Sequence, residues 1–310
     1  PNLWRETKKR DAALLVINGR ISDRAWPRYR ALAPLFRHVV DHADRILAQS
    51  AQDADRFRQL VRSPERVNVA GNLKYDAIPQ APADAVRDWI TALAPGRVWI
   101  AASTMPPVDS SDVDEDDLVI PALAQLTADH PRLLMVLAPR RPERFDEAAA
   151  KLERAGIRFV RRSALGPLEL PGVLLLDTIG ELAGLFALAD VVFMGGTLAR
   201  RGGHNILEPA YFAKPIVIGP HMENFPEIAR EFRAAQGVRE IRDASELAPV
   251  IDSLLRDPGR LGAEAQLVSA RRNSPRGANA ARFARTLDSA RIGMADPASI
   301  RMVVGVGYAP

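Results

Sequence analysis

Short apolar runs alternate with longer amphipathic stretches along most of the chain. Residues 133–138 and 191–194 contain no polar side chain, as is typical of parallel strands that helices cover on both faces. Strands alternating with helices predict a parallel sheet, and therefore an α/β fold. The expected strands are 12–18, 45–49, 66–70, 98–102, 133–138, 157–161, 173–176, 191–194, 216–218 and 238–241. The expected helices are 23–43 with breaks at its prolines, 51–61 after a Ser50 cap, 115–128, 143–155, 180–189, 209–213, 223–235, 245–255 and 259–287.

The alternation pauses at residues 71–82, which end in two prolines and read as a linker, and it then restarts. This break predicts two Rossmann-like parallel-sheet lobes, of which the first is incomplete, with about three strands. We expect residues 1–76 to be a remnant of an N-terminal lobe and residues 77–290 to form a nearly complete second lobe. The structure of the tail, 291–310, is not predicted.

The composition narrows the chemistry. The chain has no cysteine, which excludes disulfides, zinc–thiolate sites and cysteine nucleophiles. Its most apolar stretch, 173–194, is interrupted by Asp177, Glu181 and Asp190, so the sequence predicts no membrane span. Because the chain begins at Pro1 rather than at Met, we expect a fragment.

Positive charge gathers in the first quarter of the chain. Residues 1–76 hold 15 Lys and Arg against 9 Asp and Glu, whereas residues 77–310 hold 27 against 29. A basic first segment suggests contact with anions such as lipid phosphates at a membrane surface, although a solvated basic face would look the same. The interleaved aromatic and basic residues of single-strand nucleic-acid binders are not evident, so we expect no nucleic-acid partner.

Ligands of open parallel sheets bind at the carboxyl ends of the strands, and four loops there attract attention. The first begins with Ser103 and Thr104. Hydroxyls and free backbone N–H groups after a strand can hold an anion, but the same residues are common in any turn. The following segment, 109–117, carries six acidic residues and is expected to be solvated.

The second loop follows the strand at 133–138 and begins with Pro139 and Arg140. Pro142 suits the first turn of the next helix, which places Arg140 at the strand-to-helix corner. A guanidinium there can bind phosphate or carboxylate through two hydrogen bonds. Spacing alone does not separate such an arginine from a surface one. Arg144 is expected on the surface.

The third loop runs from Asp177 to Leu182. A helix beginning near Gly180 would point its N–H groups towards a ligand. Glu181 is interpreted as a first-turn carboxylate that favours the helix dipole.

The fourth loop contains Gly195-Gly196-Thr197 and then the segment 202–209. Its four glycines would let the backbone approach a ligand closely. With Pro209 as the first helical residue, Glu208 lies at the helix entrance, where its carboxylate can accept hydrogen bonds from both ribose hydroxyls. The alternative is a helix cap built from Asn205 and Glu208. Ligand binding is favoured, because a proline four residues into a capped helix would remove its first internal hydrogen bond.

The sequence lacks the motifs of several other catalytic and metal sites. The chain has no Walker loop, no His-Glu-x-x-His and no Gly-x-Ser-x-Gly elbow, so the corresponding NTPase, zinc-protease and hydrolase mechanisms are not expected. His38 and His42 lie one helical turn apart without a clear third ligand, and we predict neither a metal nor a cofactor. His204 alone is interpreted as structural.

Several segments together resemble the Kdo (3-deoxy-D-manno-octulosonic acid) transferases of the GT-B glycosyltransferase class, over most of the chain. The Asn-Gly-Arg-Ile-Ser of residues 18–22 resembles Asn-Ala-Arg-x-Ser, the segment 46–50 matches, and residues 71–76 resemble Gly-Asn-Leu-Lys-Phe-Asp. The most specific matches are Pro-Arg-x-Pro-Glu-Arg-Phe at 139–145 and the segment 202–209. The resemblance implies a GT-B fold and transfer of Kdo from CMP-Kdo to a lipid A precursor in lipopolysaccharide core biosynthesis.

The resemblance also implies roles for individual residues. Lys74 would stabilise charge in the transition state, although from the residues alone it reads as a surface lysine between lobes. The residues implied to hold CMP are Pro139, Arg140, Ile179, Gly180, Glu181, Asn205, Ile206, Leu207 and Glu208, with possible donor contacts from Ser103, Thr104, Gly195, Gly196 and Thr197. The implied reaction is inverting and needs no metal, because helix N-termini and basic side chains stabilise the leaving phosphate.

The chain departs from the family pattern in places. Its first four residues resemble the end of a Glu-Thr-Glu-x-Trp-Pro-Asn segment, and the family's general base, a Glu in His-x-x-Ser-x-Gly-Glu, lies upstream of that segment. We therefore expect CMP binding without turnover. Ala102 and residues 105–107 replace the usual Gly-Ser-Thr-His-x-Gly-Glu continuation, which leaves this loop's contacts to the donor sugar open.

The implied location is the cytoplasmic face of the bacterial inner membrane, reached through the missing N-terminus and the basic first segment. Two alternatives stay open: another GT-B nucleotide-sugar transferase or epimerase, and a non-catalytic nucleotide-binding module.

Overall fold

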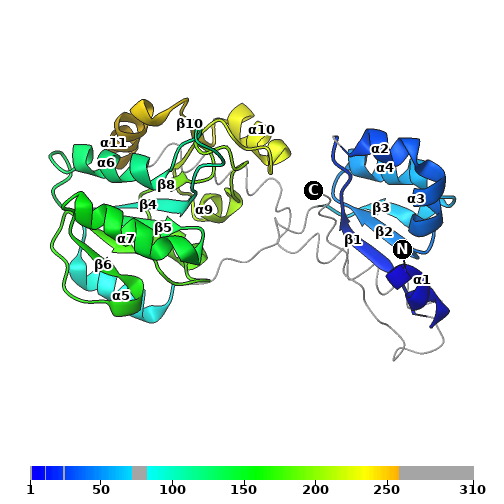
Figure 1. The fold of residues 1–310 in the computed structure, drawn as a ribbon, viewed down its shortest axis with the longest axis horizontal. Helices are drawn as coiled ribbons and strands as arrows, with labels where there is room; N and C mark the ends of the chain where they lie inside the picture. Colours follow the sequence, from blue (N-terminus) through cyan, green and yellow to red (C-terminus); the bar gives the residue numbers. More distant parts are fainter. Residues whose placement is uncertain (1, 11, 24, 72–81, 258–310) are drawn as a thin grey trace. The chain divides into compact units, whose positions relative to one another are not determined.

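A computed structural model describes residues 2–10, 12–23, 25–71 and 82–257. These residues form two compact units, each built on a parallel sheet (Figure 1). The α/β fold predicted from the alternation of apolar runs is therefore confirmed. The expected boundary at 76/77, the end of the second lobe at 290 and the tail 291–310 all lie outside the described residues.

The first unit holds three parallel strands in the order β1-β2-β3, as the sequence predicts. The strands are β1 (Leu15–Gly19), β2 (Arg45–Ala48) and β3 (Val67–Val69), and the helices are α1 (Asn2–Lys9), α2 (Trp26–Ala31), α3 (Ala33–Val40), α4 (Ala51–Leu60) and the 3-10 helix η1 (Pro64–Arg66). Helix α4 packs against β2 and β3, and its Phe57 and Leu60 are buried with Ile46 in the core.

Local signals placed the helices of this unit. Ser50 caps α4 as predicted, because its Oγ accepts a hydrogen bond from the Asp53 N–H at 3.1 Å. The helix expected at 23–43 is divided at Leu32 into α2 and α3, and Pro34 lies in the first turn of α3, where a missing N–H removes no helix bond. Helix α1 was not predicted.

The second unit holds seven parallel strands in the order β10-β9-β8-β4-β5-β7-β6. The strands are β4 (Arg97–Thr104), β5 (Leu133–Pro139), β6 (Phe159–Arg161), β7 (Gly172–Leu175), β8 (Val191–Met194), β9 (Ile216–Ile218) and β10 (Arg239–Glu240). The helices are α5 (Asp84–Leu93), α6 (Asp116–Leu126), α7 (Phe145–Arg154), α8 (Leu182–Leu185), α9 (Leu207–Tyr211), α10 (Pro226–Ala234) and α11 (Leu247–Arg256), with short 3-10 turns η3 (Pro142–Arg144), η4 (Arg162–Ala164), η5 (Phe186–Leu188) and η6 (Ala244–Glu246).

Strand order in this sheet reverses at β4. The chain runs from β4 outward to β5 and the β7–β6 edge, and then returns to place β8 on the other side of β4. Helix α6 packs between α7 and α11, and its buried side chains join those of the strands in one core. Ligands of open α/β sheets bind outside the carboxyl ends of the strands at such a reversal, so the loops after β4, β5 and β8 define the region of interest.

The structure differs from the helices predicted for the second unit. The helix expected from Gly180 begins at Leu182 and ends at Leu185, and α5 was not predicted. The helix expected at 259–287 lies outside the described residues. Within the described part of the chain, no helix combines the length and the apolar character needed to cross a membrane.

Candidate functional site

The carboxyl ends of the neighbouring parallel strands β4 and β8 approach each other closely at the centre of the site. Strand β4 continues past the predicted end at Ala102 to Thr104, and Ser103 has a positive φ of 55°. The Gly195 N–H donates to the Ala102 carbonyl at 2.7 Å, and a Cβ on Gly195 would lie 2.5 Å from the Ser103 carbonyl oxygen. Glycine at 195 is therefore required by the approach of β8 to β4. The Thr104 hydroxyl is buried and donates to Asp116 Oδ1 at 2.6 Å.

The prediction that residues 109–117 are solvated is wrong for Glu115 and Asp116, which are both 0% exposed. The Glu115 carboxylate accepts backbone hydrogen bonds from Met105 and from residues 196–199, at 2.6 to 3.1 Å. Burial raises the pKa of Glu115 to about 7, against the opposing effect of these N–H donors. The carboxylate is buried because the protein itself supplies its hydrogen-bond donors.

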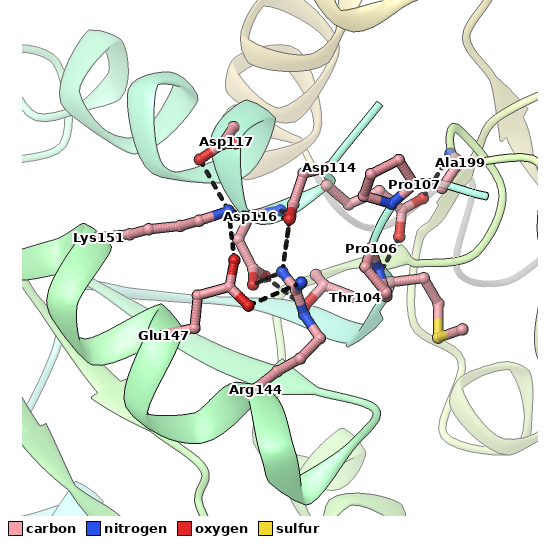
Figure 2. A network of polar contacts seen from close by, with 12 residues as sticks. Thr104, Pro106, Pro107, Asp114, Asp116, Asp117, Arg144, Glu147, Lys151 and Ala199 are labelled. Atoms are coloured by element: carbon pink, nitrogen blue, oxygen red, sulfur yellow. Dashed lines mark hydrogen bonds and ion pairs between the residues drawn. The ribbon is translucent and has the colours of Figure 1, made fainter. Parts of the chain in front are cut away.

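The prediction that Arg144 lies on the surface is also wrong, since it is 4% exposed. Figure 2 shows its guanidinium between carboxylates: it pairs with Asp114 at 2.7 Å, with Asp116, and with Glu147 at 3.2 Å. Burial would lower the pKa of Arg144, but Asp116 and Asp114 outweigh it and hold that pKa above its usual value. Burial raises the pKa of Asp116. Buried charges are tolerated in such a network because each has an opposite partner.

Lys151 extends this network along α7. Its Nζ lies 2.9 Å from Asp114 Oδ2 and 2.9 Å from Asp117 Oδ1. Burial favours the neutral form of Asp114, but the hydrogen bonds from Lys151 and Arg144 outweigh it and lower the pKa of that carboxyl. The sequence did contain a signal for this network: Arg144 and Lys151 are seven residues apart, which is two turns of a helix and hence one face.

Arg140 lies at the strand-to-helix corner, as predicted. Pro139 ends β5, Pro142 begins η3, and the Arg140 N–H donates to the Thr104 carbonyl at 3.0 Å. The Arg140 side chain is exposed, and no hydrogen bond or ion pair joins its guanidinium to another described residue. Its charge is therefore available to an anion.

The glycines of the β8 loop serve its own packing. Gly202 and Gly203 have φ values of 79° and 75°. A Cβ on Gly202 would lie 2.6 Å from the Asn224 side chain, and one on Gly203 would lie 2.4 Å from Met222 Sδ. The interpretation that these glycines open the backbone to a ligand is not needed to explain them.

Helix α9 begins at Leu207, two residues earlier than predicted, so Glu208 is its second residue and Pro209 its third. The two side chains named in the capping alternative are in contact: Asn205 Nδ2 donates to Glu208 Oε1 at 3.1 Å, and the Leu207 N–H donates to Asn205 Oδ1 at 3.2 Å. Ile206, which directly precedes α9, forms no side-chain cap. Pro209 is tolerated because the N–H groups of a first turn have no partner within the helix. Leu207 and the neighbouring Ile206 are buried and anchor this turn.

Arg140, His204 and Glu208 are brought together from two loops. Burial and, to a smaller extent, the Arg140 charge lower the pKa of His204 to about 4, so the ring is neutral at pH 7. Burial raises the pKa of Glu208, while Asn205 and Arg140 act in the opposite direction. His204 Nε2 is buried without a hydrogen-bond partner. These groups can bind an anion and accept hydrogen bonds from a neutral ligand group.

The β7 loop carries the three remaining predicted CMP contacts. Ile179 is 78% exposed, and Gly180 has a φ of 91°. Glu181 immediately precedes α8, where it accepts hydrogen bonds from Arg162 at 2.8 Å and from Thr178. Its carboxylate is thus already paired within the protein.

One predicted site residue is not described by the structure, and two residues that form the site were not predicted. Lys74 lies outside the described residues, so its expected role stays a prediction. Glu115 and Arg144 were missed as site-forming residues.

In the described ranges, no three His, Asp or Glu side chains are arranged to hold a metal ion.

Comparisons with known proteins bear on the whole chain. A family model described as 3-deoxy-D-manno-octulosonic-acid transferase (kdotransferase) matches residues 1–77. The 3-deoxy-D-manno-octulosonic acid transferase of Haemophilus influenzae is 34% identical over 261 residues, which are 82% of this chain and 59% of that protein. The Bordetella pertussis transferase of the same name is 34% identical over 299 residues, 93% of this chain and 66% of that protein. The chain thus spans about three fifths to two thirds of the length of these relatives.

Solved structures agree with the fold. The C-terminal CMP-Kdo binding domain of WaaA from Acinetobacter baumannii is 33% identical, with a TM-score of 0.52, covering 59% of this chain and 92% of that domain. Anabaena Alr3699/HepE in complex with UDP has a TM-score of 0.52 at 16% identity, covering 93% of this chain and 76% of that one. The second likeness concerns the fold alone, and the GT-B class predicted for the chain is confirmed.

Proposed function

The chain belongs to the family of Kdo transferases, and we propose that its second unit binds the CMP part of a CMP-Kdo donor. The solved domain that is 33% identical is described as a CMP-Kdo binding domain, and it covers 59% of this chain. The whole enzyme would transfer Kdo from CMP-Kdo to a lipid A precursor in lipopolysaccharide core biosynthesis.

The observation that carries the proposal is the exposed, unpaired Arg140 guanidinium at the carboxyl end of β5, whose charge acts on Glu208. Arg140 is exposed at the carboxyl end of β5 and acts electrostatically on both His204 and Glu208. The phosphate of the nucleotide, a diester in CMP-Kdo and a monoester in CMP, supplies the anion that Arg140 lacks. Glu208 can accept hydrogen bonds from the ribose hydroxyls of the same nucleotide, and the neutral His204 leaves Arg140 as the cation for the phosphate.

The proposed reaction is an inverting displacement without a metal. The acceptor hydroxyl attacks the anomeric carbon while a carboxylate takes its proton, and CMP leaves with the electrons of the broken bond. Arg140 and, by family resemblance, Lys74 would stabilise the charge that develops on the leaving phosphate. The resemblance assigns the base to a segment that these 310 residues do not contain, so nucleotide binding, rather than turnover, is the property to measure.

We also propose that the first unit contacts the membrane surface, at the cytoplasmic face of the inner membrane that the family resemblance implies. Leu32 and Leu35, at the junction of α2 and α3, are 47% and 61% exposed. Arg28 and Arg30 on α2 are exposed close by in the chain. Apolar and basic side chains together favour a surface of anionic lipid. Sedimentation with anionic rather than neutral vesicles, weakened in a Leu32→Ser/Leu35→Ser double variant, is the expected result; equal sedimentation with both kinds of vesicle would contradict it.

Calorimetric titration of the chain with CMP and with UDP tests the proposed donor. We expect saturable CMP binding that is roughly 30-fold weaker in Arg140→Ala, or about 2 kcal/mol, the scale of hydrogen bonds to a charged group. Arg141→Ala removes the neighbouring exposed arginine and should bind CMP as the wild type does. UDP should bind at least tenfold more weakly than CMP, roughly 1.4 kcal/mol.

The other outcomes are informative. Equal binding of UDP and CMP would favour another nucleotide-sugar transferase or an epimerase. A folded chain that binds neither nucleotide would show the proposal to be wrong.

A further inference from the structure

One carboxylate joins the β4 loop to the β8 loop. Glu115 Oε2 accepts from the Met105 N–H at 2.9 Å and from the Gly196 N–H at 2.6 Å. Glu115 Oε1 accepts from the N–H groups of the next three residues, 197 to 199, at 3.0 to 3.1 Å. The side chain is 0% exposed, so the carboxylate acts inside the protein and not on a ligand.

The turn at 196–199 depends on both oxygens of this carboxylate. Successive N–H groups that converge on one point form an anion-binding nest, and here the anion is Glu115. Buried N–H groups need acceptors. Replacement by glutamine would leave one acceptor oxygen and would turn an NH₂ group towards backbone donors.

The same turn supports the residues proposed to bind the nucleotide. The Gly203 N–H donates to the Gly196 carbonyl at 2.7 Å. A Cβ on Gly196 would lie 3.1 Å from His204 Nε2, so the imidazole packs directly over this glycine. His204 leads without interruption into residues 205–208, whose Asn and Glu side chains are hydrogen-bonded. Movement of Gly196 would therefore displace this whole segment.

We propose that Glu115 is a positioning residue of the nucleotide site: it holds the turn at 196–199 and thereby fixes His204 and residues 205–208. The inference rests on the proposed CMP-binding function. The adjacent Asp116 supports the other side of the site in the same manner, because it accepts from the Thr104 hydroxyl while the Thr104 carbonyl accepts from the Arg140 N–H. Two consecutive carboxylates at the start of α6 thus support both loops.

The test compares Glu115→Gln with Glu115→Asp in the full chain, by CMP titration and by amide hydrogen exchange. Glu115→Gln should bind CMP about tenfold more weakly, a change of about 1.4 kcal/mol, with faster exchange at 196–199 and also at 203–208. Glu115→Asp keeps the charge on a shorter side chain and should recover part of the affinity.

Two controls separate positioning from general destabilisation. Glu153→Gln changes an exposed glutamate on α7 and should leave affinity and exchange unchanged. Ile90→Ala empties a buried position on α5, a helix that ends near Arg132 before the amino end of β5. It should lower stability and leave CMP affinity intact.

The outcomes are distinct. A folded Glu115→Gln variant with wild-type CMP affinity would overturn the inference, as would faster exchange confined to 196–199. If Glu115→Gln fails to fold, Glu115→Asp decides: an affinity below that of the wild type supports positioning, and an unchanged affinity overturns it. Absence of CMP binding by the wild type would instead refute the proposed function, and the exchange at 203–208 would then decide the positioning role alone.

Discussion

Arg140 and Arg144 lie four residues apart after the same strand, in opposite surroundings. Arg144 is buried between Asp114 and Asp116, whereas the Arg140 guanidinium is exposed and has no partner among the described residues. We call the first region the closed half of the site and the second the open half. The closed half comprises Thr104, Asp114, Glu115, Asp116, Arg144, Lys151 and residues 196–199; the open half comprises Arg140, His204, Asn205 and Glu208.

The comparison shows two ways of placing polar groups at one edge of a sheet. In the closed half, the protein supplies a partner for each buried charge, so the charges fix the shape of the loops. In the open half, burial raises the pKa of Glu208, against the effects of Asn205 and Arg140, and it lowers the pKa of His204 in the same direction as the Arg140 charge. Perturbed groups without complete internal pairing are typical of binding sites. Substitutions that break the ion pairs of the closed half should therefore change stability most, whereas substitutions that remove a ligand contact of the open half, at Arg140 or Glu208, should change affinity most.

The largest effect is expected from Arg144→Met. It removes the buried cation and leaves Asp116, which is 0% exposed, without its ion partner. Breaking a buried pair from one side destabilises by about 3–5 kcal/mol. The free energy of unfolding of the second unit, measured from the urea dependence of amide exchange in β4, checks this value. Arg154→Met, at an exposed position at the end of the same helix, should change it by less than about 0.5 kcal/mol; equal losses would remove the distinction between the two halves.

A pH dependence of about 2 kcal/mol is expected from His204. Its pKa is about 4 in the folded protein against 6.5 ordinarily, so the folded state binds fewer protons than the unfolded state between these values. The stabilisation is complete above pH 6.5 and is lost as the pH falls towards 4. The expected change in the free energy of unfolding is smaller than the whole pKa difference would give, because the His204 ring is partly exposed. Unfolding free energies at pH 7 and 4.5 should differ less in His204→Gln than in the wild type, whereas His38→Gln, at an exposed position in the first unit, should leave the difference unchanged. Identical pH slopes in wild type and His204→Gln would argue against a neutral buried imidazole.

Thr104→Val, in the closed half, should lower the free energy of unfolding of the second unit by about 1.5 kcal/mol. The substitution keeps the shape of the buried side chain but removes the donor that lies 2.6 Å from Asp116 Oδ1, leaving that oxygen with fewer hydrogen bonds. The same urea and exchange measurement applies. Thr91→Val, on the exposed face of α5, is the matched control, and a similar loss there would show that the Thr104 hydroxyl contributes nothing specific.

Glu208→Gln should have the smallest effect on stability, within about 0.5 kcal/mol. Burial already disfavours the charge, and glutamine keeps an acceptor oxygen for Asn205 Nδ2. CMP affinity should fall about fivefold, close to 1 kcal/mol. Comparing CMP with 2′-deoxy-CMP locates the contact: the wild type should prefer CMP, and the variant should prefer it less. An unchanged preference would remove Glu208 from the ribose contact.

The strands were predictable where their signal is local. Val191–Met194 and Ile216–Ile218 were identified to the residue, because a short uninterrupted apolar run is typical of a parallel strand that helices cover on both faces. The Ser50 cap was found for the same reason, since its partner Asp53 is three residues away. Helices α1 and α5 were missed.

The closed half was not predictable from local pattern. Glu115 contacts N–H groups about 80 positions later in the chain, and Asp116 contacts Arg144, which is 28 positions away. Without those partners in view, six acidic residues in nine read as a solvated segment. The corner position of Arg140 followed from its strand and from Pro142, but the start of α9 was misplaced because Pro209 fits any position of a first turn.

The order of the seven-stranded sheet leaves short strands at both edges: β6 has three residues and β10 has two. Arg161 ends the first, and Arg239 and Glu240 make up the second. Brief, charged edges give another chain little to pair with, which is how natural sheets avoid edge-to-edge aggregation. The sheet therefore combines a largely apolar centre with edge strands that discourage pairing between molecules, which favours a dispersed sample at the concentrations that NMR spectroscopy of nucleotide binding requires.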